Sequence, residues 1–160
     1  MTSIARPAPR RLASFTLPSV PGSERIALAQ VAGSVASLGL SPARLDRLKT
    51  AVAETTMNAI EHGNDGRPEL PVRVEVFHSG AEVIVTITDR GGRNDDSGPE
   101  SSAELPELGR KLDGGQGPRG WGLFLIRHMV DAMDITTQGE EHTVRLMMRI
   151  GSQDASRGED

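Results

Sequence analysis

The sequence predicts an α+β fold, a two-layer sandwich in which helices cover one face of a mixed sheet. Two observations predict this class. In some segments apolar and polar residues alternate, as in strands, and in others apolar residues recur three or four apart, as in helices. The strand-like segments lie both before and after the helical ones. Their order is a strand, two helices, two strands, a long glycine-rich segment, a helix and two strands. The 160 residues have the length of one domain.

The N-terminal half is predicted to supply one strand and two helices. Residues 12–18 alternate weakly and end in a proline, as an edge strand can. A first helix is expected at 23–38. A second should end at about His62, with Ser41 as N-cap and Pro42 at the first helical position, and a glycine follows each helix. The apolar positions of the two helices are Ile26, Val31, Val35 and Leu38, then Leu45, Leu48, Val52, Thr56 and Ala59.

The C-terminal half is predicted to contain four strands and one helix. Strands at 71–77 and 82–88, rich in valine, isoleucine and threonine, should form a hairpin. Residues 90–119 are rich in glycine and lack periodicity, which is typical of a functional lid or a disordered segment. A third helix is expected to start at Gly120. The last two strands are expected at about 134–138 and 143–150.

The composition argues against several classes of protein. Without cysteine, the chain has neither a disulfide framework nor a thiolate site. A net charge of -4, with Arg6, Arg10 and Arg11 as the only basic cluster, argues against a nucleic-acid binder. No apolar run approaches a membrane span, so no membrane contact is expected and the location is predicted to be cytoplasmic. The predicted organisation is a disordered arm at 1–11, one domain at 12–150 with a lid at 93–119, and a disordered tail at 151–160.

Three polar residues of the second helix form a candidate site. Glu54, Asn58 and His62 are four residues apart, so they stack along one side, nearly opposite the apolar stripe. Such a row is usually only the solvated face of a helix. Asparagine favours a functional interpretation, because it is a mediocre helix former that suits mid-helix only where its amide is needed.

A second cluster, Asp89 and Gly91, follows directly on the strand 82–88. Asp and Gly at a strand end most often mean a turn. A carboxylate held there can also accept a hydrogen bond from an amino group, while the glycine lets a flat ring approach the backbone. From this cluster alone, both interpretations stand.

Glycines between Gly114 and Gly122 lead into the third helix, whose free N–H groups and dipole would make a natural phosphate site. The alternative is a flexible linker, but two glycines flanking Trp121 favour a close backbone approach. A GxGxxG pattern lies at 115–120, yet no buried strand precedes it, and Asp134 starts a strand where a ribose-binding acid should end one. A dinucleotide fold is therefore not predicted. The sequence contains no GxxxxGK(S/T) motif, so a P-loop is not predicted either, and the histidines lack the spacing of a catalytic metal cage.

The three clusters, taken in order, resemble the N, G1 and G2 boxes of the Bergerat (GHKL) superfamily of ATP-binding domains over about residues 12–150. The motifs are Glu54-x-x-x-Asn58-Ala59-x-x-His62-Gly63, Asp89-x-Gly91 and Gly120-x-Gly122-Leu123. Within the superfamily, the strings NAIEHG and GLFLIRHMVD are similar to those of the bacterial anti-sigma factor serine/threonine kinases.

This resemblance implies roles for individual residues. Asn58 would offer its side-chain oxygen to Mg²⁺, and Asp89 would accept a hydrogen bond from the adenine amino group of ATP. Glu54 would be the general base that orients the attacking hydroxyl, while Gly120 and Gly122 would present backbone N–H groups to the phosphates. The positions implied to bind the cofactor are Asn58, His62, Asp89, Gly91, Gly120, Trp121, Gly122 and Leu123.

The function that the resemblance implies is an ATP-dependent serine/threonine kinase acting as an anti-sigma factor. Its partners would be an anti-anti-sigma (STAS-type) protein, which it phosphorylates, a sigma factor, and a second copy in a homodimer. The alternative is a noncatalytic ATP-binding switch that binds a signalling partner. A histidine kinase and a gyrase-type ATPase are not expected, because neither a phosphoacceptor hairpin nor a transducer domain is recognised. Arg93 replaces the second glycine of the usual DxGxG pattern, which bears on lid geometry and affinity.

Overall fold

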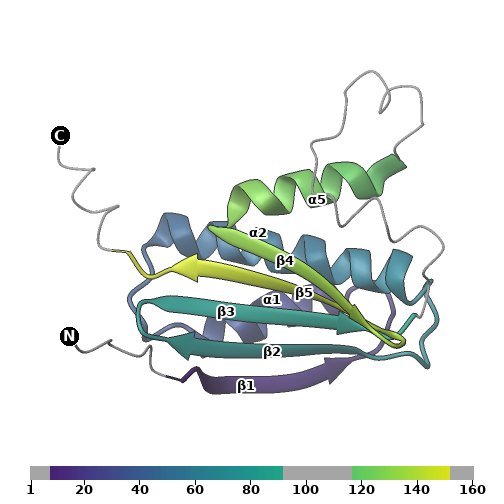
Figure 1. Ribbon diagram of the computed structural model, residues 1–160, viewed down its shortest axis with the longest axis horizontal. Helices are drawn as coiled ribbons and strands as arrows, with labels where there is room; N and C mark the ends of the chain where they lie inside the picture. Colours follow the sequence, from purple (N-terminus) through teal and green to yellow (C-terminus); the bar gives the residue numbers. More distant parts are fainter. Residues whose placement is uncertain (1–7, 92–116, 152–160) are drawn as a thin grey trace, which may run out of the picture.

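The computed structural model describes residues 8–91 and 117–151, with the side chains of 117–121 excepted. Its elements are β1 Arg10–Leu17, α1 Ser23–Ser34, α2 Pro42–Asn58, a π-helical turn Ala59–Gly63, β2 Val72–Ser79, β3 Glu82–Asp89, α5 Gly117–Met129, β4 Ala132–Gln138 and β5 Glu141–Arg149. The helices pack on one face of the sheet, and Figure 1 shows the sheet from its other side. The predicted α+β two-layer sandwich is thereby confirmed.

The sheet has the strand order β1-β2-β3-β5-β4, and every neighbouring pair is antiparallel. The prediction of a mixed sheet is therefore wrong. The crossover through α5 does leave β3 and β4 pointing in the same direction, but β5 lies between them, so they form no parallel ladder. The N-terminal strand, β1, lies at an edge as predicted.

Helix α2 begins and ends close to its predicted limits. The hydroxyl of Ser41 accepts a hydrogen bond from the backbone N–H of Arg44 at 3.1 Å, and Pro42 occupies the first helical position. The predicted core stripe is confirmed at Leu48, Val52 and Thr56, which are all fully buried. After Asn58 the chain continues as the π-helical turn up to Gly63.

Helix α1 is shorter than predicted, and one of its apolar residues lies outside the core. It ends at Ser34, because the amide of Ala36 bonds the carbonyl of Gly33, and the chain beyond continues in turns with this tighter spacing. Its buried face carries Ala27 and Val31, whereas Ile26, one of the apolar positions that predicted the helix, is 48% exposed. None of the described helices has the length and apolar character needed to span a membrane.

Helix α5 starts at Gly117, three residues before the predicted start at Gly120. A proline at the second helical position is compatible with this start, because the first-turn N–H groups have no partner within the helix. Most of the predicted lid at 93–119 lies outside the described residues, as do most of the predicted arm at 1–11 and the tail at 151–160. Strand β1 already begins at Arg10, within the predicted arm.

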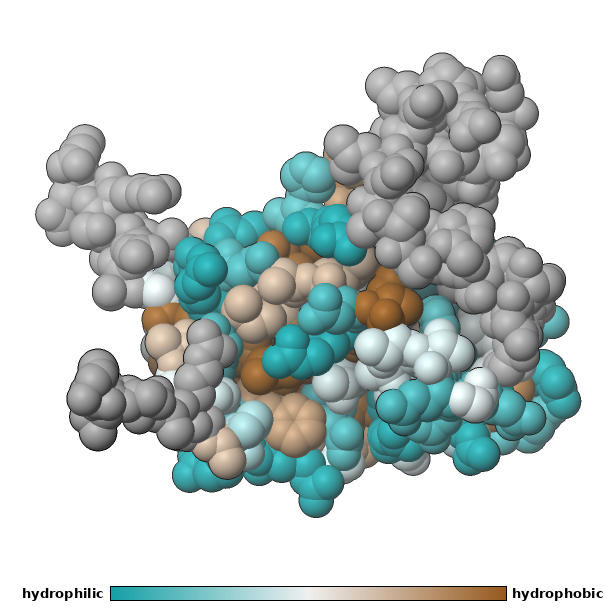
Figure 2. Space-filling view, viewed as in Figure 1, coloured by the Kyte–Doolittle hydropathy of each residue, from teal (hydrophilic) through white to brown (hydrophobic). Residues whose placement is uncertain are grey.

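The two faces of the sheet differ in character. Alternate residues of the inner strands point towards the helices and form the core, and Val74, Val85 and Leu146 are fully buried there. On the other face, Phe77 and Met147 flank Ile84 in register across three strands. Figure 2 shows apolar side chains gathered in the middle of this face, among hydrophilic ones.

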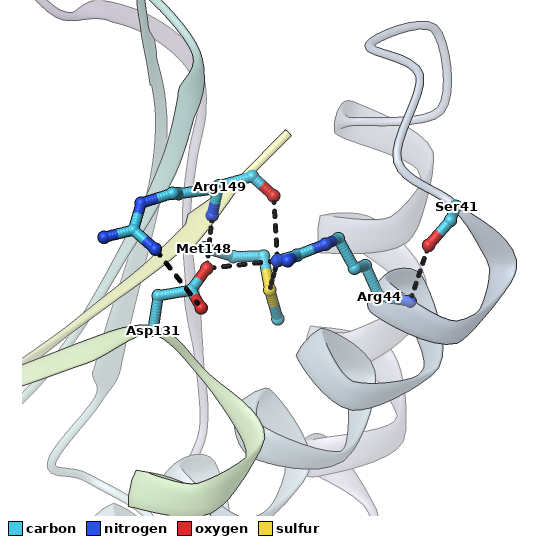
Figure 3. Close-up of polar contacts among 5 residues, drawn as sticks. All are labelled: Ser41, Arg44, Asp131, Met148 and Arg149. Carbon is cyan, nitrogen blue, oxygen red and sulfur yellow. Dashed lines mark hydrogen bonds and ion pairs between the residues drawn. The ribbon is translucent and has the colours of Figure 1, made fainter. Parts of the chain in front are cut away.

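A polar cluster connects the start of α2 to the end of the sheet (Figure 3). Arg44, which is 8% exposed, donates hydrogen bonds from Nη1 to Oδ2 of Asp131 at 3.1 Å and to the carbonyl of Arg149 at 3.2 Å. The same Oδ2 accepts the backbone N–H of Arg149 at 2.7 Å. Because Asp131 immediately precedes β4, the cluster fixes the helix layer to the β4–β5 pair.

Candidate functional site

The polar row of α2 does not face solvent; it faces α5. A Cβ atom placed on Gly122 would lie 3.2 Å from Nδ2 of Asn58 and 3.4 Å from Oε1 of Glu54. Glycine at this position of α5 therefore lets the helix approach both polar side chains closely. His62 lies in the π-helical turn, which is wider than an α-helical one, so the predicted four-residue stacking ends at Asn58.

Asp89 is buried at the end of β3 and faces the helix layer. Its residue exposure is 5%, and its Oδ1 accepts the backbone N–H of Gly91 at 3.2 Å. Its other carboxylate oxygen, Oδ2, lies 3.7 Å from Nδ1 of His142 on the neighbouring strand β5. A buried carboxylate requires polar partners, and the hydrogen bond from Gly91 uses only part of its accepting capacity.

Two glycines allow the end of the π-helical turn to lie directly against Asp89. A Cβ atom on Gly63 would overlap the carboxylate of Asp89, and one on Gly91 would overlap the carbonyl of Gly63. Glycine at position 91 is therefore required by this backbone contact. Its predicted role in making room for a flat ring stays a prediction.

Asn64 also fixes the contact between the end of the π-helical turn and the end of β3. It is fully buried, and its Oδ1 accepts the backbone N–H of Arg90 at 2.8 Å. Its Nδ2 donates to Oγ of Ser19 at 2.8 Å and to the carbonyl of Leu70 at 3.0 Å. The segment after α2 and the segment after β3 are thus held together by one amide side chain, which positions Asp89.

A pocket lies between α2, α5 and the end of the sheet where β3 terminates. Its residues combine an apolar wall with a few polar groups, as in sites for small organic ligands. They are Thr55, Asn58, Ala59, Ile87, Asp89, Leu123, Ile126, Ile135, His142 and Val144. In Figure 1 this end of β3 is the end away from the two chain termini.

Two polar atoms of the pocket have no partner in the part of the chain that the structure describes. They are Oγ1 of Thr55 and Nδ2 of Asn58, and both are buried. A buried polar group without a hydrogen bond destabilises the fold by about 1 to 3 kcal/mol. Groups of this kind beside a pocket are what a polar ligand would satisfy.

The structure brings together most of the predicted site residues. Asn58, Asp89 and Leu123 line the pocket. Glu54 and Gly122 adjoin Asn58, and Gly91 adjoins Asp89 through its backbone N–H. Gly120 and Trp121 belong to the first turns of α5. Since the helix starts early, Gly122 lies beyond the four residues whose N–H groups are free, and its glycine serves close packing.

Three residues of this region were not predicted from the sequence: Thr55, Asn64 and His142. His142 could have been found by strand alternation, because it shares the inward parity of Val144 and Leu146. Thr55 is next to Glu54 in the sequence but does not belong to the four-residue spacing of the predicted polar row. No local pattern in the sequence signals that the side chain of Asn64 joins two distant segments.

The donors available for a metal ion are few. Among the described residues, no group of three or more His, Asp or Glu side chains is arranged to hold one. The oxygens of Glu54 and Asn58 near Gly122 nevertheless fit Mg²⁺, which prefers oxygen ligands and takes only one or two from the protein when substrate phosphates supply others.

The comparison with protein families assigns this sandwich and its pocket to a class of ATPase domain. The chain belongs to the histidine kinase-like ATPase domain family, which matches residues 17–148. The resemblance to the Bergerat superfamily is thereby confirmed.

Similar proteins include anti-sigma factors. The anti-sigma F factor of Bacillus cytotoxicus is 31% identical over 116 residues, which cover 71% of this chain and 74% of that protein. The serine-protein kinase RsbW of Bacillus pumilus is 28% identical over 134 residues, covering 78% and 77% of the two chains.

Solved structures share the fold. The SiaB–SiaC complex of Pseudomonas aeruginosa contains a chain that aligns with a TM-score of 0.62 at 16% identity, over 87% of this chain and 90% of that one. The RsbU and RsbW domains of a Mycobacterium tuberculosis protein align with a TM-score of 0.59 at 19% identity, over 86% of this chain and 32% of that one.

Proposed function

We propose that the chain is an ATP-dependent serine/threonine protein kinase that acts as an anti-sigma factor in the cytoplasm. Family membership and the relatives named anti-sigma F factor and serine-protein kinase support this assignment. The observation that carries the kinase step is the position of Glu54, whose carboxylate lies against Gly122 of α5, beside the pocket residue Asn58.

In this proposal the chain binds ATP in the pocket. Asp89 accepts a hydrogen bond from the adenine amino group, and the apolar side chains of Ile87 and Ile126 pack on the ring. The phosphates lie towards the first turn of α5, which contains Gly120 and offers backbone N–H groups. Mg²⁺, held by Asn58 with Glu54 nearby, would neutralise phosphate charge when bound.

Glu54 then accepts the proton of the attacking hydroxyl, which a serine or threonine of the partner supplies. The partner in this proposal is an anti-anti-sigma protein of the STAS type. A sigma factor would be the protein that the chain sequesters, acting as a homodimer. The names of the relatives support a sigma factor as a partner. The STAS-type protein and the homodimer rest on the resemblance of the sequence motifs to the anti-sigma factor kinases.

Replacement of Glu54 by Gln tests the kinase step, because the variant keeps the size of the side chain and removes the base. We expect phosphate transfer to fall by about 10²- to 10⁴-fold while ATP affinity changes little. Transfer would be measured with radiolabelled ATP and the anti-anti-sigma protein whose gene lies nearest to the gene of this chain. Affinity would be measured by calorimetry on the same preparations.

The matched control is Glu61→Gln, because Glu61 is exposed on the turn that follows α2. It should transfer phosphate at the wild-type rate. If Glu54→Gln also does so, Glu54 is not the base. If the wild-type protein binds ATP but labels no partner, the chain is a noncatalytic switch. Failure to bind ATP would contradict both the kinase and the switch.

A further inference from the structure

His142 and Asp89 lie side by side in the pocket, on the neighbouring strands β5 and β3. They are direct neighbours in the β3–β5 register, and both strands turn these side chains towards the helices. Nδ1 of His142 lies 3.7 Å from Oδ2 of Asp89, and the two side chains are 14% and 8% exposed. The next residue, Thr143, points to the other face, where its hydroxyl meets that of Thr88 at 2.8 Å.

Both facing atoms have hydrogen-bonding capacity to spare. A separation of 3.7 Å is too long for a hydrogen bond, so the imidazole does not satisfy the carboxylate. Within the described ranges, no hydrogen bond occupies either ring nitrogen of His142. The adjacent carboxylate favours the tautomer with the proton on Nδ1. The pocket therefore presents an acceptor and a donor side by side.

This pair complements one edge of adenine. The base carries its 6-amino donor next to the N1 acceptor, and proteins read such edges by matched hydrogen bonds. We propose that His142 is a base-recognition residue, whose Nδ1–H donates to N1 while Oδ2 of Asp89 accepts from the 6-amino group. The proposal rests on ATP binding in this pocket, as the proposed function requires.

Three variants separate recognition from structure. His142→Leu removes the donor with a side chain of similar size, and His142→Asn places an amide N–H near the position of Nδ1. We expect ATP affinity to fall about fivefold to tenfold in the Leu variant and to stay within about threefold of wild type in the Asn variant. His78→Leu is the control, because His78 lies at the far end of β2 and bonds the carbonyl of Gly80.

The decisive probe is 1-deaza-ATP, which has a C–H in place of N1. The wild-type protein should bind it about fivefold to tenfold more weakly than ATP, since the Nδ1–H donor would lose its acceptor. His142→Leu should bind the two nucleotides with equal affinity. A structural role of His142 would not produce this coupling, and unchanged melting temperatures without nucleotide would show that the variants fold.

The outcomes distinguish this inference from the proposed function. If the wild type binds ATP but loses nothing with 1-deaza-ATP, His142 does not read N1. The inference is equally overturned if His142→Leu keeps the full preference for ATP over 1-deaza-ATP. If the wild type binds neither nucleotide, the proposed function itself fails.

Discussion

Thr55 and Thr56 are adjacent threonines of α2 that differ in one respect. Both are buried, at 1% and 0% exposure, and in the part of the chain that the structure describes neither hydroxyl has a hydrogen-bond partner. Only Thr55 lines the pocket. The pair therefore separates the effect of an unpartnered hydroxyl on the fold from its effect on ligand binding.

Replacement of each threonine by valine should leave the free energy of unfolding unchanged or raise it by about 1 kcal/mol, because an unsatisfied buried hydroxyl is removed. Thr55→Val should in addition weaken ATP binding by about threefold to tenfold, whereas Thr56→Val should not. Urea denaturation and calorimetric titration measure the two quantities. Equal loss of affinity in both variants would contradict a ligand contact at Thr55.

At the residue scale, the sequence predicted side chains that belong to recognisable spacings. Glu54 and Asn58 were found because four-residue spacing places them on one side of a helix. The direction that side faces could not be predicted, since Gly122 lies more than sixty residues further along the chain. His142 was missed for a similar reason: its significance comes from Asp89 on another strand.

At the element scale, the π-helical turn Ala59–Gly63 is the part of the site that periodicity did not predict. The backbone N–H of Asn64 donates to the carbonyl of Ala59, five residues earlier, at 2.7 Å. Apolar spacing predicts helix and strand identity well, but it does not encode a change of hydrogen-bond register at a helix end. The same limit explains the early end of α1, where the spacing of the hydrogen bonds tightens.

Gly63→Ala tests whether the contact between this turn and Asp89 is required. The new Cβ would overlap the carboxylate, so we expect a loss of about 1 to 3 kcal/mol in the free energy of unfolding and at least tenfold weaker ATP binding. Denaturant titration and calorimetry measure these effects.

The control is Gly33→Ala in the last turn of α1, where a Cβ would meet nothing within 4 Å. Because alanine favours the helix, this variant should gain up to about 1 kcal/mol in stability and bind ATP normally. Wild-type affinity in Gly63→Ala would show that the turn can move away from Asp89 without consequence.

At the scale of the whole molecule, α2 connects two different structures. Its C-terminal end carries Glu54 and Asn58 in the candidate site, and its N-terminal end carries Arg44 in the cluster of Figure 3. At a rise of about 1.5 Å per residue, Arg44 and Asn58 are about 21 Å apart along the helix axis. The sequence predicted the helix but not this anchor, because Asp131 is distant in the chain.

Arg44→Met should destabilise the fold without affecting the site. Methionine keeps much of the length of the side chain but removes the donor to Asp131 and to the carbonyl of Arg149. The loss should be about 1 to 3 kcal/mol, less than for a fully buried pair, because the Asp131 side chain is 23% exposed and keeps the Arg149 amide as a partner. Denaturant unfolding measures it.

The matched control for this anchor is Arg67→Met, which breaks an ion pair with Glu69 whose side chains are 59% and 62% exposed. Exposed pairs contribute little, so its free energy of unfolding should stay within about 0.5 kcal/mol of wild type. ATP affinity of folded Arg44→Met should remain within about twofold of wild type, because the cluster lies at the other end of α2. A larger loss of affinity would mean that the anchor also sets the position of Glu54 and Asn58, and the two ends of the helix would then have to be treated as one unit.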